Sequence, residues 1–251
     1  MVQTESRAKV TSWGDLLKLE ERPAVISPPE IGYLGFTQEQ GRWVHSQLTG
    51  FGLPLDRLVG VRYTANEEKT KNTLGMCTQN NEVGVIDLFK SLEKLPREAQ
   101  CGTMAHELAH LNHPDQAVNL NAYGSQEKMD EVQNFVHSVA DQTIATGKYL
   151  NGYQRVLVEQ FNNGQIDRAR LDHETFAILV ELRFTNSAHL QQVDQAQKMH
   201  GGKVRLMTGM FSGKAEGIDV ALMALTKKNS VEELRQHLTK VKDGFRSGKP
   251  L

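Results

Sequence analysis

The chain has 251 residues, of which 39% are hydrophobic and 24% are charged, and its formal net charge is −1 at pH 7. This length can bury a large core without cross-links, and the balanced charge argues against a polybasic nucleic-acid-binding chain and against a disordered one. The sequence has two cysteines, no apolar run of signal-peptide length near the N-terminus and no run of 18 apolar residues. It therefore predicts a cytoplasmic protein with no disulfide framework and no membrane span.

The first part of the chain is predicted to contain one helix and three strands. Residues 1–36 are expected to form an arm or small subdomain that ends in the irregular stretch ISPPEIGYLG. Thr37 and Gln40 then make a capping box for a helix over 38–48. Three β-rich stretches follow and predict a small three-stranded sheet, over residues 58–65, 73–79 and 82–89.

The apolar spacing becomes helical after Pro96, which is a good first helical residue. The stretch REAQCGTMAHELAHLNH is predicted to be a helix that Pro114 ends and that packs on the sheet. Further helices are predicted over 127–147, 151–161, 170–199 and 230–244, and the stretch 203–211 is either strand or loop. The sequence thus predicts an α+β fold, with a core at 37–185 and a helical C-terminal extension at 186–251.

The stretch MAHELAH contains the pattern His-Glu-x-x-His. A helix brings positions i and i+4 to one face, so the imidazoles of His106 and His110 can bind one cation, for which Zn²⁺ is the expected ion. Glu107 lies beside them and can accept a proton from a water molecule that attacks a carbonyl group. The motif therefore predicts two metal ligands, His106 and His110, and one catalytic base, Glu107.

The stretch from residue 73 to residue 111 resembles the core of the SprT-like and Spartan metallopeptidases. In that family a Gly-x-Cys strand leads to a strand with an Ile-x-Leu ending and then to the helix with the histidine motif. The matching residues are Gly75, Cys77, Ile86, Leu88, His106, Glu107 and His110. The resemblance implies a zincin fold in which the strand before the helix lies along the substrate cleft. It also implies protein or peptide substrates associated with DNA, with DNA as a further partner.

A catalytic zinc usually has three protein ligands, so one ligand beyond the two histidines is missing. Metzincins and SprT-related proteins with a compact site place a histidine six residues after the second one, but that position is Gln116 here. Glu174, with the small Ala177 on the same side of its helix, resembles the third-ligand helix of gluzincins and is the preferred ligand. His173 and His137 remain the alternatives. Neighbours on a helix point about 100° apart, so His173 and Glu174 are not expected to bind one ion together.

These features predict a zinc metallopeptidase, that is, a hydrolase that cleaves internal peptide bonds. Tyr123 and Tyr153 are both candidates for stabilising the oxyanion, and the sequence does not choose between them. Cys77 is expected to be a small buried strand residue rather than a zinc ligand. The alternative is a catalytically weak zincin-like module that binds or regulates a partner, as in an effector or phage-type protein, and Gln116 favours this alternative.

Overall fold

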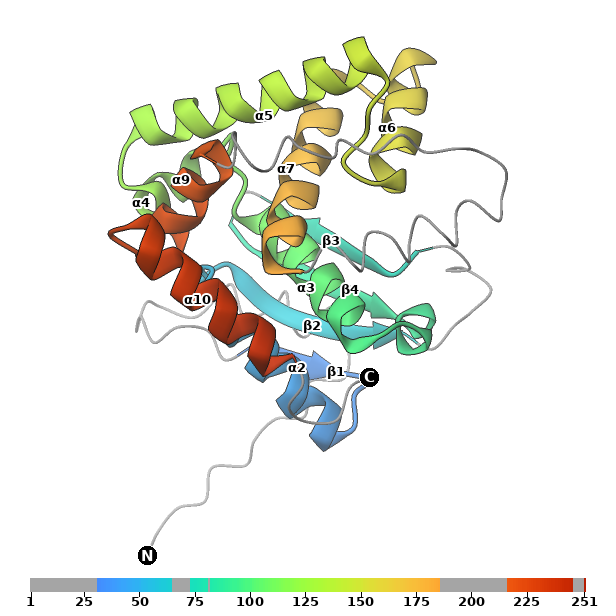
Figure 1. Cartoon of the computed structure of the whole chain (residues 1–251). Helices are drawn as coiled ribbons and strands as arrows, with labels where there is room; N and C mark the ends of the chain where they lie inside the picture. The colour runs from blue at the N-terminus through green and yellow to red at the C-terminus, as the bar shows by residue number, and fades with distance from the viewer. Residues whose placement is uncertain (1–30, 65–72, 81, 186–215, 246–250) are drawn as a thin grey trace, which may run out of the picture.

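The computed structural model describes residues 31–64, 73–80, 82–185, 216–245 and 251, which form an α+β fold (Figure 1). The described part has eight α-helices and one small sheet. The strands are β1 (Gly32–Leu34), β2 (Leu58–Thr64), β3 (Gly75–Gln79) and β4 (Gly84–Phe89). The helices are α2 (Gln38–Gly50), α3 (Arg97–Leu111), α4 (Leu120–Tyr123), α5 (Gln126–Thr146), α6 (Gly152–Asn162), α7 (Arg168–Phe184), α9 (Glu216–Leu225) and α10 (Val231–Gly244), with short 3₁₀ turns η2 (Lys90–Lys94) and η3 (Ala117–Asn119).

The sheet has the strand order β1-β2-β4-β3, in which β3 is antiparallel to β4 and the other neighbours are parallel. All six residues of β4 are buried, whereas β3 lies at an edge and alternates between partly buried and exposed residues. The prediction of three strands was wrong, because β1 is a fourth. The three residues of β1 are too few to show an alternating pattern. The strand is formed by pairing with β2, in which Val61 lies opposite Tyr33 of β1.

Helix α3, which carries the histidine motif, packs between the sheet and α7. Every residue from Ala99 to Leu111 is buried, so the helix has no solvent-facing side after its first turn. The helix begins directly after Pro96, as predicted. The capping box of Thr37 and Gln40 on α2 is also confirmed, since both of its hydrogen bonds are present.

The helices predicted over 127–147, 151–161 and 230–244 are confirmed to within one residue at each end, as α5, α6 and α10. Helix α9 was not predicted. It contacts α5 and α7, while α10 contacts α2 and α7. The division of the chain at residues 36 and 185 stays a prediction.

Helix α7 begins two residues before its predicted start, because the Asp167 carboxylate accepts a hydrogen bond from the backbone N–H of Arg170 and caps the first turn. It ends at Phe184, and the remainder of the predicted helix to 199 lies outside the described residues, as does the stretch 203–211. No helix among the described residues has both the length and the apolar character that a membrane span requires.

Candidate metal centre

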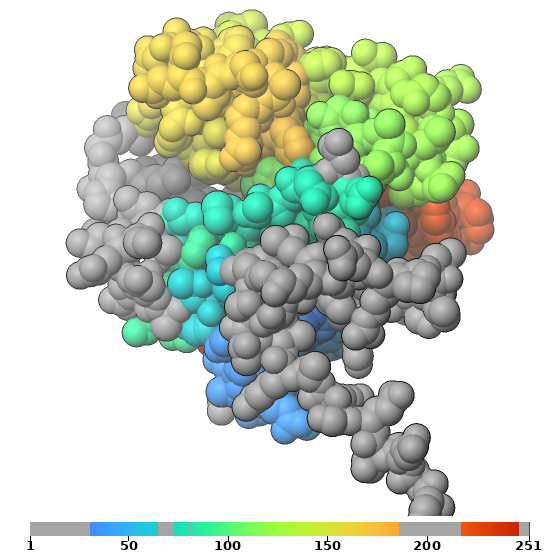
Figure 2. All heavy atoms as spheres, turned by 180° about the vertical axis from the view of Figure 1, so that it is seen from behind, coloured from blue at the N-terminus to red at the C-terminus, as the bar shows by residue number. Residues whose placement is uncertain are grey.

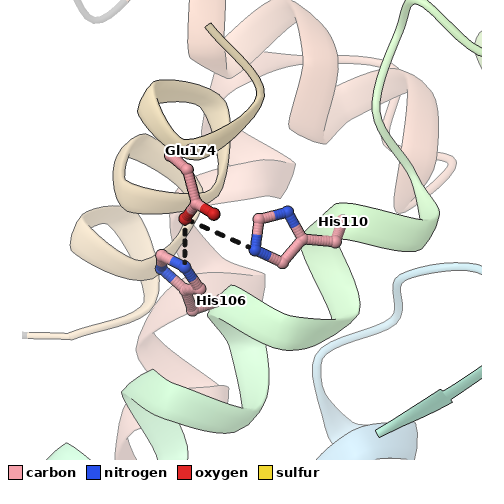
Figure 3. Close-up of side chains that lie close together, drawn as sticks. All are labelled: His106, His110 and Glu174. Atoms are coloured by element: carbon pink, nitrogen blue, oxygen red, sulfur yellow. Dashed lines mark hydrogen bonds and ion pairs between the residues drawn. The ribbon is translucent and has the colours of Figure 1, made fainter. Parts of the chain in front are cut away.

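The side chains of His106, His110 and Glu174 meet between α3 and α7 (Figure 3). The two imidazoles project from successive turns of α3, with ring centroids 5.0 Å apart and ring planes at 80°. The Nε2 atoms of both rings face Oε2 of Glu174, at 3.3 Å from His106 and 3.6 Å from His110. The predicted motif residues and the preferred third ligand are therefore brought together.

The distances from Glu174 to the two histidines suit a single metal ion. Zinc bonds to nitrogen and oxygen of about 2.0–2.1 Å in a tetrahedral arrangement place neighbouring donors about 3.3–3.4 Å apart. The two distances to Glu174 lie close to that value. All three residues are buried, with exposed fractions of 8% for His106, 7% for His110 and 1% for Glu174. This group could hold a metal ion.

Glu174 reaches the motif because α7 packs closely against α3. A Cβ atom placed on Gly102 of α3 would lie 2.8 Å from Cγ2 of Thr185, so a larger residue there would push the end of α7 away. Ala177, one turn beyond Glu174, is fully buried. The small residue that was expected to permit the approach of the second helix is thus inside the packed core.

Two further side chains of α7 hold the group in place. Glu181 accepts a hydrogen bond at Oε2 from Nδ1 of His106 over 3.2 Å, while Arg170 pairs with Oε1 of Glu174 at 2.5 Å. A carboxylate on the outer nitrogen of a ligating histidine fixes the ring orientation and increases its basicity. Sequence reasoning missed both contacts, although Arg170 stands four residues before Glu174, where a helix brings side chains together.

The charges of the group favour a cation between the donors. Burial disfavours the charged form of His106, but hydrogen bonds to Glu174 and Glu181 outweigh burial and raise its pKa to about 10. Burial lowers the pKa of His110 well below its ordinary value, so this ring is neutral and available as a ligand. The proton that His106 shares with Glu174 thus lies where a metal ion would replace it.

Glu107 lies on the side of α3 that faces β3. It is 6% exposed, and it accepts a hydrogen bond from the backbone N–H of Cys77. A Cβ atom on Gly75 would lie only 2.8 Å from Oε1 of Glu107, so glycine at this position leaves the carboxylate its space. Burial raises the pKa of Glu107 to about 7, which suits a group that takes up and returns a proton near neutral pH.

The alternative ligands His137 and His173 have other partners, as does Gln116 at the compact-site position. Nδ1 of His137 lies 2.6 Å from Oδ2 of Asp172, and His137 is not part of the group. The Gln116 side chain donates a hydrogen bond to the backbone carbonyl of His110 and contacts Arg57, which itself binds the end of α3. His173 stacks on His113, beside the group rather than in it.

The two candidate tyrosines differ in exposure and in hydrogen-bond partner. The hydroxyl of Tyr123 is buried and donates to the backbone carbonyl of Asn112 at 2.8 Å, so it has a structural partner. Tyr153 is 39% exposed, its ring lies 6.1 Å from that of His106, and its hydroxyl is hydrogen-bonded to Glu174. Cys77 was expected to be buried, but it is only partly buried, and it packs against the core from β3.

No protein-family model, no curated protein and no solved structure matches the chain.

Proposed function

We propose that the chain is a zinc-dependent endopeptidase with a zincin-like core. The observation that carries this proposal is the convergence of His106, His110 and Glu174, whose two histidine–carboxylate distances fit one tetrahedral ion. The Glu107 carboxylate lies on α3 between the two histidines. Two histidines and a carboxylate form the donor set of catalytic zinc sites that keep one position for water. A bound zinc ion would supply Lewis-acid chemistry, lowering the pKa of water and polarising the scissile carbonyl.

Glu107 is the group that moves protons in this mechanism. Its carboxylate accepts a proton from the attacking water and then donates it to the amine that leaves when the peptide bond breaks. The burial that raises its pKa to about 7 keeps the two protonation states close in free energy. Its hydrogen bond from the backbone of Cys77 fixes the carboxylate against β3.

Tyr153 is the residue best placed to stabilise the oxyanion. It is partly exposed on α6, beside His106 and hydrogen-bonded to Glu174. Burial raises the pKa of its hydroxyl, which therefore stays protonated, and in the reaction this proton would turn from Glu174 to the oxyanion.

Strand β3 offers a place for the peptide itself. It is an edge strand among the described strands, and its Gly75 lies against Glu107. An extended peptide can add to such an edge through backbone hydrogen bonds. In Figure 2 the surface of β3, in teal, runs below α6 and α7, in yellow to orange. We therefore place the substrate along β3, below α6.

The test compares the wild type with Glu107→Gln in metal content and in cleavage of an unfolded protein such as casein. The variant keeps His106, His110 and Glu174, so it is expected to bind zinc at the wild-type stoichiometry and to lose nearly all cleavage. Cleavage by Glu107→Gln at the wild-type rate would refute the mechanism. Wild-type protein that holds no zinc after dialysis would refute the metal centre.

DNA-associated substrates follow only from the resemblance to the SprT-like family. Adding single-stranded DNA to the cleavage assay tests this part separately, since stimulation is expected for a peptidase that acts on DNA-bound proteins. The binding-module alternative rested on the missing histidine at Gln116. Glu174 completes a three-residue group without that histidine, so no observation favours the alternative over the peptidase.

A further inference from the structure

Three histidine rings lie side by side next to the candidate metal centre. The His173 ring lies 4.8 Å from that of His110 at an interplanar angle of 35°, and 4.3 Å from that of His113 at 8°. Phe176 contacts the far ring edge-on at 5.1 Å, and Oδ1 of Asp115 lies 2.5 Å from Nδ1 of His113. We call His110, His173 and His113 the histidine stack.

His113, Asp115 and His173 also form a second group of potential metal ligands. Their geometry does not suit an ion. The 2.5 Å between His113 and Asp115 is a hydrogen-bond distance, well below the roughly 3.3–3.4 Å that separates two ligands of one zinc ion. Imidazole lone pairs lie in the ring plane, so two rings at 8° and 4.3 Å direct them within two nearly parallel planes, which do not meet at one ion. The two ligating rings of the first group, by contrast, stand at 80°.

The two motif histidines differ in whether a hydrogen bond at Nδ1 holds the ring. Nδ1 of His106 is held by Glu181, so a hydrogen bond fixes that ring. Nδ1 of His110 is buried and has no hydrogen-bond partner among the described residues. Rotation of the His110 ring about its Cβ–Cγ bond is therefore limited by packing, and the aromatic surface at 4.8 Å is that of His173.

We propose that His173 is a positioning residue, which holds His110 in its metal-binding orientation through ring stacking. The inference rests on the metal centre of the proposed function. His113 supports the other face of His173, and Asp115 anchors His113. Partners that orient ligating histidines typically change metal affinity by about 10–100-fold when they are removed, and a similar loss is expected here.

The experiment measures Co²⁺ binding to the metal-free full-length chain by visible absorption, which reports affinity, stoichiometry and coordination geometry without any cleavage. His173→Ala and His173→Gln remove the ring, and Gln keeps most of the volume in case Ala unfolds the protein. His173→Phe keeps an aromatic ring but has no nitrogen. His237→Ala is the matched control, because His237 is also half-buried but hydrogen-bonds to the backbone of Phe51, away from the site.

One Co²⁺ ion per wild-type chain is expected, with at least tenfold weaker binding in His173→Ala and His173→Gln. His173→Phe is expected to bind within about threefold of the wild type, with the same spectrum. Wild-type affinity in the ringless variants, or a loss in His173→Phe equal to theirs, would overturn the positioning role. Two ions per wild-type chain and one per His173→Phe chain would overturn it in favour of a second metal site. If the wild type binds no ion, the proposed function itself fails.

Discussion

Replacing Glu174 by Gln tests the candidate metal centre at its single donor from α7. The amide is nearly the same size as the carboxylate, but it is neutral and a poor zinc ligand. Loss of partners that only orient a ligand weakens metal binding by about 10–100-fold, so loss of a ligand itself is expected to weaken binding by at least about 100-fold. The backbone of α7 is expected to be unchanged, since Glu174 contributes no cap to the helix.

The expected effect on thermal stability follows from linkage. An ion present at 1,000 times its dissociation constant stabilises the folded state by about 4.1 kcal/mol, and at 10 times by about 1.4 kcal/mol. A chain of 251 residues has an unfolding entropy of about 0.5 kcal/mol/K. Zinc should thus raise the Tm of the metal-free wild type by about 8 °C, and that of Glu174→Gln by about 3 °C or less, at the same zinc concentration.

The assay is thermal unfolding of chelator-treated protein with and without added zinc. Each variant is compared with itself, so changes in its metal-free stability cancel. Glu159→Gln is the matched control, because Glu159 lies on α6 in an exposed ion pair with Arg155 and should keep the full increase in Tm. If Glu174→Gln shows the same zinc-induced increase as the wild type, Glu174 is not a ligand and the donor set proposed for the metal centre is wrong.

Three further predictions concern the residues around the ion. Gly75→Ala places a methyl group 2.8 Å from Oε1 of Glu107, so the rate of cleavage should fall at least about tenfold while the zinc content stays unchanged. Gly50→Ala is the control and should have no effect, because its Cβ atom meets nothing within 4 Å. Tyr153→Phe should lower kcat by about 100-fold with little change in KM; an unchanged kcat would exclude the oxyanion role. In metal-free protein, burial raises the pKa of Glu107 from 4.5 to about 7, so its contribution to stability is complete below pH 4.5 and is lost as pH rises through 7. At pH 8, Glu107→Gln should therefore be more stable than the wild type by up to about 3 kcal/mol in the free energy of unfolding, whereas at pH 4.5 the two should be equally stable. Equal differences in stability at both pH values would contradict the burial of a charged Glu107.

The sequence could identify the parts of the site that depend on local helix geometry. His106 and His110 are one turn apart, so any helix through them brings both rings to one face. The capping residue Thr37 likewise acts within one turn, and it accepts the hydrogen bond that the sequence predicts. The ends of α5, α6 and α10 agreed with prediction to within one residue.

The sequence could not choose the third donor, because that choice depends on how α7 packs against α3. Glu174 and His173 are adjacent, and a rotation of α7 by about 100° would exchange their positions relative to the motif. The close approach at Gly102 and the burial of Ala177 turn Glu174 towards the two histidines and leave His173 stacked beside them. The local sequence does not determine how α7 is rotated about its axis.

Strand β1 is also a feature that tertiary contacts decide and local sequence does not. Residues 32–34 have no strand pattern of their own, and only the neighbouring β2 supplies partners for their backbone groups. The tertiary structure also shows that Gln116 donates a hydrogen bond to the carbonyl of His110 near the end of α3. The sequence alone indicates only that this position lacks a zinc-binding histidine. The sequence by itself determined the motif, because a helix repeats every 3.6 residues. Only the packing of segments distant in the chain decided which carboxylate faces that motif.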